Sequence, residues 1–111
     1  MAWQILEYES IRKGRPVTEF IQKQKPKTIA KIIHLVDLLE EYGPMLAMPH
    51  AKKVDAFLYE LRARGKDEIR ILYGFVGKII YLLHGFKKQT QKTPVKELDT
   101  ARQRIMSVKK R

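Results

Sequence analysis

The sequence predicts an α+β domain in which helices pack on a mostly antiparallel sheet. Short apolar or alternating segments occur once near the N-terminus and three times in the second half of the chain. Two segments with apolar residues three and four positions apart follow the first of these, and a third ends the chain. The expected order is therefore β-α-α-β-β-β-α. Because 111 residues suffice for one core, we expect a single domain over residues 1–111.

The first half of the chain is predicted to hold one strand and two helices. Residues 2–8, AWQILEY, have the side chains that favour a strand. A short helix is predicted over residues 16–24 and a longer one over 26–42, each opened by a proline. The Gly-Pro pair that follows is typical of a helix end. These two helices should form an antiparallel hairpin. Residues 45–56 show no helical or strand periodicity in their apolar residues and are expected to form a long loop.

The second half is predicted to form three strands and a final helix. The strands span residues 57–63, 68–75 and 78–86, and the turn-like sequences RGKD and VG join them as successive hairpins. Thr93 is a candidate N-cap for the last helix, with Pro94 at its first position.

The net charge is the most informative bulk property. The chain has 23 Lys and Arg against 12 Asp and Glu, a formal charge of +11. From His84 to Arg111 there are nine basic residues and two acids. Such an excess indicates a polyanion or an acidic protein as partner. Solubility and a frayed basic end at Lys109–Arg111 remain the alternative.

Several chemistries find no support in the sequence. It has no phosphate-binding glycine loop and no cysteine, and its three histidines lie in different predicted elements without the spacing of metal ligands. We therefore expect no metal or cofactor. No apolar run is long enough for a membrane span, and the N-terminus does not resemble a secretory signal. A cytoplasmic protein without a membrane partner is the expectation.

A group of cations is predicted at one end of the sheet. Arg62 and Arg70 lie on the less apolar faces of neighbouring strands, and Lys87 and Lys88 extend from the third strand. One interpretation is an intramolecular ion pair. Its candidate acids are Glu60, Asp67 and Glu68. The other is a basic cleft for phosphates, because the planar arginine fork suits phosphate oxygens. In that case we expect the two lysines to face the arginines in a site without acids.

A basic cleft of this kind would bind nucleic acid or also cut RNA. Without a metal, the 2′-OH of RNA attacks its own neighbouring phosphate. The reaction needs a group that removes the hydroxyl proton, stabilisation of the charge on phosphorus, and a donor for the leaving oxygen. Lysine, arginine, tyrosine and histidine are able to share these tasks.

Three sequence motifs, in this order and spacing, resemble the RelE/HigB-like toxins. They are YELR, LLHGF and TQKTP, and the likeness extends from about Glu7 to Arg104, including the predicted helix pair. It is greatest for the phage-derived and HigB-type branch of the RelE/ParE superfamily. The fold that this resemblance implies is a twisted antiparallel sheet with an N-terminal helical hairpin and a C-terminal helix.

The resemblance implies the toxin of a type II toxin–antitoxin system. Such toxins are ribosome-dependent endoribonucleases, or mRNA interferases, that cleave mRNA in the decoding site and inhibit translation. The implied partners are mRNA on the ribosome and a cognate antitoxin, usually of the helix-turn-helix type. Operator DNA is reached only through the toxin–antitoxin complex.

The resemblance also implies roles for individual residues. Arg70 matches the strand arginine that stabilises the phosphate, and Arg62 matches a second arginine beside the cleft. Lys87 and Lys88 match the basic pair that holds the scissile phosphate or assists proton transfer. The remaining candidates are, as acid or base, Tyr73 and His84 and, as RNA contacts, Lys52, Lys53 and Lys92. Alternation places Tyr73 opposite Arg70, which favours packing for that residue.

Two other functions remain open on the same scaffold. ParE-type toxins resemble this superfamily and inhibit DNA gyrase without catalysis. A degenerate toxin kept as a nucleic-acid-binding or antitoxin-binding module is the third interpretation. The paired strand arginines favour the nuclease, because inhibition of gyrase by contact needs no group that stabilises a phosphate.

Overall fold

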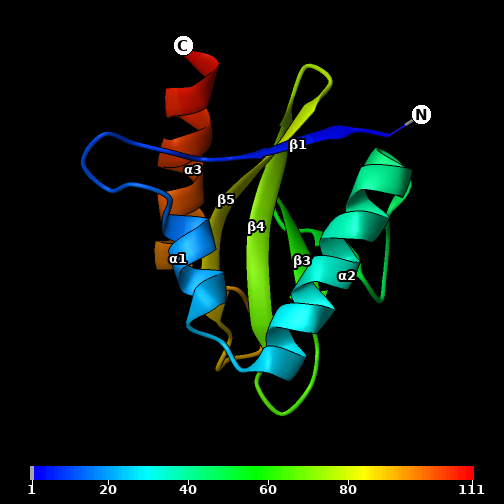
Figure 1. Ribbon diagram of the computed structural model, residues 1–111. Coiled ribbons are helices and arrows are strands. Elements are labelled where there is room, and N and C mark those ends of the chain that lie inside the picture. The colour runs from blue at the N-terminus through cyan, green and yellow to red at the C-terminus, as the bar shows by residue number, and fades with distance from the viewer. Residues whose placement is uncertain (1) are drawn as a thin grey trace.

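The computed structural model describes residues 2–111, which form a five-stranded mixed sheet covered by helices on both faces (Figure 1). The elements are, in chain order, β1 Gln4–Glu7, α1 Pro16–Gln22, α2 Pro26–Tyr42, the 3₁₀ helix η1 Gly43–Met45, β2 Ala51–Lys53, β3 Tyr59–Ala63, β4 Ile69–Val76, β5 Ile79–Lys87 and α3 Val95–Lys109. Within residues 2–111, no helix has both the length and the apolar character needed to cross a membrane.

The strands lie in the order β1-β5-β4-β3-β2. Strands β2 to β5 pair antiparallel with their neighbours, whereas β1 pairs parallel with β5. The α+β prediction is confirmed, but the expected order of elements omits β2. This three-residue strand lies inside the segment expected to be a loop and pairs Ala51 with Leu61. Three residues are too few for alternation to be visible, so backbone pairing alone defines β2.

Each face of the sheet has its own apolar core. The α1–α2 hairpin covers one face, where Val17, Ile32 and Leu39 are buried with Ile71 and other strand residues. Helix α3 covers part of the other face (Figure 1), and a separate set of residues is buried beneath it. These are Leu58, Leu72, Leu83, Phe86, Ala101 and Ile105. The second face is covered by one helix rather than two, which leaves room beside α3 for polar side chains.

A β-bulge in β5 changes which side chains reach the α3 face. Tyr73 pairs with Leu82, but the preceding residue, Leu72, pairs with His84, so Leu83 is an extra residue in β5. Before the bulge, even-numbered Leu82 lies in the core beneath the helical hairpin. After it, even-numbered Phe86 packs in the core beneath α3. The bulge therefore exchanges the two faces for the last four residues of the strand, 84–87.

The start of α3 differs from the prediction. Helix α3 begins at Val95, Pro94 occupies the N-cap position, and no side chain in the described chain caps the helix. Proline fits this position because it has no backbone N–H to be satisfied. The expectation that Thr93 caps the helix is therefore wrong, and its hydroxyl is used elsewhere.

We predict that Gly85→Ala destabilises the protein by about 1–3 kcal/mol through overpacking. Gly85 pairs with Ile71 in the sheet, and a Cβ at this position would overlap the ring of Phe20 from α1. Urea unfolding measures the effect. In a Phe20→Ala background the same substitution should cost clearly less, because the opposing ring is gone. Equal costs in the two backgrounds would show that Phe20 is not the opposing group.

Candidate functional site

Two rows of side chains cross the α3 face of the sheet. The first row runs from β2 to β5 through Lys52, Glu60, Leu72 and His84. The second row runs from β3 to β5 through Arg62, Arg70 and Phe86. Directly opposite residues of paired strands point to the same face, so the cations of both rows lie around Glu60. The pairing of Arg62 with Arg70, expected from alternation, is present.

The two arginines and Glu60 form a buried charged group. Side-chain exposure is 12% for Arg62, 2% for Arg70 and 1% for Glu60. Oε1 of Glu60 lies 3.6 Å from Nε of Arg70 and 3.8 Å from Nε of Arg62. These are ion-pair distances but too long for hydrogen bonds. Neither Nε has a hydrogen-bond partner among residues 2–111.

The remaining contacts hold each guanidinium in place from its outer side. Nη1 of Arg70 donates to the Ile69 carbonyl at 3.1 Å and to Oε2 of Glu68 at 3.3 Å. Nη1 of Arg62 lies 2.8 Å from Sδ of Met48. These neighbours therefore hold the arginines in position while both Nε atoms lie near one shared carboxylate oxygen.

Lys88 joins this group from the end of β5. Its backbone N–H donates to the Glu68 carbonyl at 2.7 Å, which extends the ladder between β4 and β5 by one residue. Partial burial lowers the pKa of the Lys88 ammonium, and the positive charges of Arg70, Arg62 and Lys52 add to the shift. The negative charge of Glu60 opposes it. Lys88 is thus a partly desolvated amine whose proton is held less tightly than that of an ordinary lysine.

A pocket of about 340 Å³ opens beside this group of charges, and Glu60 and Lys88 are the members of the group that line it. Its lining comes from β2, β3, the loop that follows β5, and the start of α3. The lining residues are Lys52, Lys53, Val54, Glu60, Lys88, Gln91, Lys92, Thr93 and Leu98. With four lysines and one buried acid, the pocket suits an anion that also presents an apolar or planar part to Val54 and Leu98.

Glu60, expected only as a candidate ion-pair acid, and Thr93, expected to cap the last helix, both belong to this site. The hydroxyl of Thr93 donates to Oε2 of Glu60 at 3.0 Å. The expectation of a site without acids is therefore wrong, and the intramolecular ion pair with Glu60 is present. The signal for Glu60 was its place in YELR, where an acid follows the β-favouring Tyr59 and precedes the buried Leu61.

Lys87 does not belong to this group of side chains. It pairs with Ile69, whose side chain is buried on the helical-hairpin face, and its ammonium lies 3.0 Å from Oδ1 of Asp67. The expectation that Lys87 faces Arg62 and Arg70 is wrong. Successive strand residues point to opposite faces, so Lys87 and Lys88 are separated.

The other predicted residues are distributed over both faces. Tyr73 is buried beneath the helical hairpin and stacks on Tyr59 at 5.5 Å, and this burial raises the pKa of its phenol. Lys53 pairs with Tyr59, and its ammonium lies 5.9 Å from the centre of that ring. His84 is on the α3 face, but its Nε2 is 2.8 Å from Oε1 of Glu97 in α3. The site therefore brings together Arg62, Arg70, Lys88, Lys52 and Lys92.

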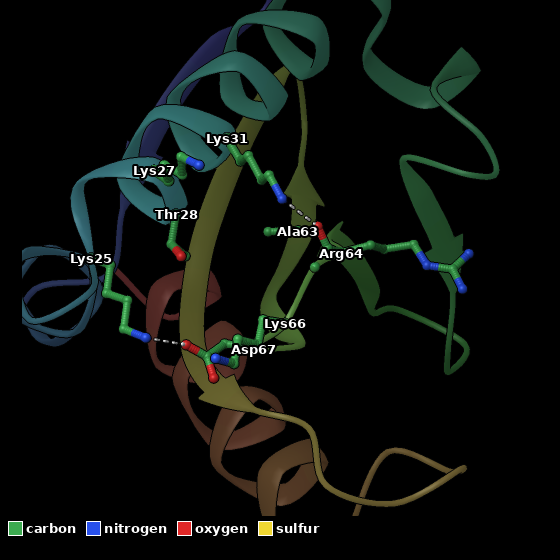
Figure 2. A pocket seen from close by; sticks show the side chains of 9 residues that line it. Lys25, Lys27, Thr28, Lys31, Ala63, Arg64, Lys66 and Asp67 are labelled. Atoms are coloured by element: carbon green, nitrogen blue, oxygen red, sulfur yellow. Dashed lines mark hydrogen bonds and ion pairs between the residues drawn. The ribbon is translucent and has the colours of Figure 1, made fainter.

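A second basic hollow lies at the other face, between the start of α2 and the β3–β4 turn (Figure 2). Its cations do not converge. Nζ of Lys31 donates to the Arg64 carbonyl at 2.8 Å, and Lys25 lies 3.9 Å from Asp67. The Arg64 side chain points away from the hollow in Figure 2. These contacts make Lys31 and Lys25 links between the N-terminal end of α2 and the β3–β4 turn.

The sequence profile of the phage-derived Gp49-like proteins matches residues 19–106. The chain belongs to the Gp49-like family. The phage-derived branch to which YELR, LLHGF and TQKTP pointed is thereby confirmed at the level of the family. No curated protein sequence matches the chain significantly.

Solved structures of YoeB and RelE toxins share the fold of this Gp49-like protein. The YoeB dimer from Staphylococcus aureus gives a TM-score of 0.54 at 15% identity, covering 81% of this chain and 100% of that one. The YoeB–YefM complex from the same organism gives 0.54 at 15%, covering 78% and 99%. The archaeal RelE–RelB complex from Pyrococcus horikoshii gives 0.52 at 16%, covering 78% and 96%. At these identities the likeness establishes the fold.

We predict that Lys87→Gln raises the pKa of the Asp67 carboxyl toward its ordinary value of 3.8. The hydrogen bond and charge of Lys87 lower that pKa in the native protein. A lowered native pKa stabilises the fold above the unfolded-state pKa, and the stabilisation is lost as pH falls through the native pKa. Wild type should therefore be the more stable protein near neutral pH, with the difference vanishing in acid.

Carbon NMR of the Asp67 carboxyl and urea unfolding across this pH range test the prediction. Lys88→Gln is the matched control. Because Lys88 lies on the α3 face, this substitution should leave the pKa of Asp67 unchanged. An Asp67 pKa that moves equally in both variants would contradict the assignment of the two lysines to opposite faces.

Proposed function

We propose that this Gp49-like protein is the toxin of a type II toxin–antitoxin pair and that it cleaves mRNA on the ribosome. The observation that carries the proposal is the group formed by Arg62, Arg70 and Lys88 around Glu60, beside an open basic pocket that Glu60 and Lys88 line. Two guanidiniums whose Nε–H groups have no hydrogen-bond partner among residues 2–111 meet there with an amine of lowered pKa. The family and the fold shared with YoeB and RelE support the same conclusion.

In the proposed reaction the 2′-oxygen of the RNA attacks the adjacent phosphorus and the bond to the 5′-oxygen breaks. Lys88, in its neutral form, takes the 2′-OH proton, since its lowered pKa makes the free amine more available. Arg62 and Arg70 stabilise the extra negative charge on the pentacoordinate phosphorus. The leaving 5′-oxygen takes a proton from water. The products are a 2′,3′-cyclic phosphate and a 5′-hydroxyl.

Lys52 and Lys92 bind the RNA backbone on either side of the reacting phosphate. Both line the pocket, one from β2 and the other from the loop after β5. Lysine suits this task because its ammonium acts as a point charge on a flexible chain. The proposal assigns no catalytic role to Tyr73, His84 or Lys87.

An antitoxin is the second proposed partner. The YoeB and RelE neighbours include complexes with YefM and RelB, and the YoeB–YefM assembly is a heterotetramer. A chain of the same fold and family is expected to be held inactive by a comparable partner. The helix-turn-helix type of this antitoxin and binding to operator DNA through the complex stay predictions.

We predict that Arg70→Lys lowers mRNA cleavage by about a hundredfold to a thousandfold, because the charge remains while the planar fork is lost. Lys88→Gln should reduce the rate similarly. Lys87→Gln should retain wild-type activity, since its ammonium pairs with Asp67 on the other face. Mapping of mRNA 5′ ends after induction in bacteria, and cleavage on translating ribosomes in vitro, measure these rates.

A message with a single 2′-deoxynucleotide before the cleavage point should resist cleavage entirely. Intact mRNA together with gyrase-linked DNA breaks after induction would contradict the proposal and favour an inhibitor of the ParE type. Loss of activity in Lys87→Gln but not in Lys88→Gln would reverse the assignment of the lysines.

Ribosome binding should weaken as salt rises, because lysine contacts with phosphates release counterions. We predict that Lys92→Gln reduces the slope of the logarithm of affinity against the logarithm of salt concentration by about 0.7. Lys110→Gln, at the exposed end of α3, is the control and should leave the slope unchanged. An equal reduction in both variants would indicate that the basic charge acts diffusely.

A further inference from the structure

Glu60 is a carboxylate buried where a substrate phosphate is proposed to bind. Its exposure is 1%, and it lies in β3 between Lys52 of β2 and Leu72 of β4. Removing a carboxylate from water is costly unless paired cations and hydrogen bonds compensate. An acid in the floor of a phosphate site also repels the substrate. Its presence therefore calls for a compensating role.

The contacts of Glu60 are not those of an ion pair built for stability. Stable arginine–carboxylate pairs make two parallel hydrogen bonds of about 2.7–2.9 Å. Here one oxygen, Oε1, is shared by two Nε atoms at 3.6 and 3.8 Å. Both Nε–H groups stay without a hydrogen-bond partner in the described part of the chain. The carboxylate attracts both guanidiniums, but it does not accept a hydrogen bond from either Nε–H group.

We propose that Glu60 is a positioning residue of the site, which holds Arg62, Arg70 and Lys88 together before RNA binds. This inference rests on the proposed function. With Lys52 of β2, four cations meet here: Arg62 from β3, Arg70 from β4 and Lys88 from the end of β5 are the others. Without a central anion their mutual repulsion would drive them apart. Glu60 is the counter-charge that lets them stay preassembled, so binding of the phosphate needs no rearrangement.

Thr93 extends this role to the loop over the pocket. Its hydroxyl donates to Oε2 of Glu60, while Oε1 faces the arginines. Thr93 ends the segment that carries Lys88 and Lys92, which both line the pocket. One carboxylate therefore ties the sheet arginines and the lysine-bearing loop to a single point. This explains why a threonine stands before Pro94 although it does not cap α3.

Glu60→Gln, which keeps the shape and removes the charge, tests the proposal. We expect the single-turnover cleavage rate on saturating ribosomes to fall about a hundredfold. The ribosome concentration that gives half the maximal rate should not rise, because the charge that is removed repels the phosphate. Asp99→Asn is the matched control: it removes one acid from an ion pair with Arg102 on α3, away from the pocket, and should leave the rate unchanged.

The second readout is the titration of Lys88. The charged groups that face it are Lys52 from β2, Glu60 and Arg62 from β3, Arg70 from β4 with Glu68 before it, and Lys92 from the loop. Because Glu60 opposes the lowering of the Lys88 pKa, Glu60→Gln should lower it further. The rising limb of the pH–rate profile, and the NMR titration of Lys88, should both move to lower pH.

A folded Glu60→Gln protein with the wild-type rate and an unchanged Lys88 titration would overturn the proposal while the proposed function stands. If wild type does not cleave RNA, the proposed function fails, and the Lys88 titration alone decides whether Glu60 sets the charge of the site. If Glu60→Gln does not fold, Thr93→Val serves instead. It should lower the cleavage rate relative to Thr100→Val, whose hydroxyl bonds only within α3. Equal rates would overturn the role of Glu60.

Discussion

The burial of Arg62, Arg70 and Glu60 inside the sheet is the constraint on which the rest of the site depends. Two arginines directly opposite each other on neighbouring strands repel, and neither tolerates removal from water without an anion. Glu60 makes this pairing tolerable because it lies two residues before Arg62 on β3, and its side chain therefore points to the same face of the sheet. The register of β3 against β4 is thereby fixed by charge as well as by the apolar residues of both faces.

The two faces of the sheet have different roles: one forms the larger apolar core, and the other carries the charged group. The helical-hairpin face is a continuous apolar core that includes the Tyr59–Tyr73 stack. The other face is shared between α3, which buries Phe86 and Leu72, and the charged group at the strand ends. Because α3 covers only part of this face, the buried arginines lie on rigid strands beside a pocket whose lysines are open to a ligand. A rigid scaffold of this kind holds reacting groups in place without a binding-induced fold change.

Much of the fold follows from local patterns. Prolines and periodic apolar residues define the helices, and alternation identifies the long strands and the Arg62–Arg70 pair. The features that escaped prediction depend on tertiary contacts. Strand β2 exists because Ala51 pairs with Leu61. The bond from Thr93 to Glu60 spans 33 positions and has no local signature. Alternation already places Glu60 and Arg62 on one face of β3, but the choice of Glu60 over Asp67 as the acid shared by both arginines follows from the register of β3 against β4.

The bulge at Leu83 has a consequence for how the end of β5 tolerates a change in length. After the bulge, even-numbered residues of β5 face α3, whereas before it odd-numbered residues do. This change alone directs Lys88 rather than Lys87 toward the arginines. An insertion or deletion of one residue between the bulge and the end of the strand would exchange the two lysines without altering either side chain. Paired lysines at this strand end therefore buffer the site against such shifts, since one of them meets the arginines in either register.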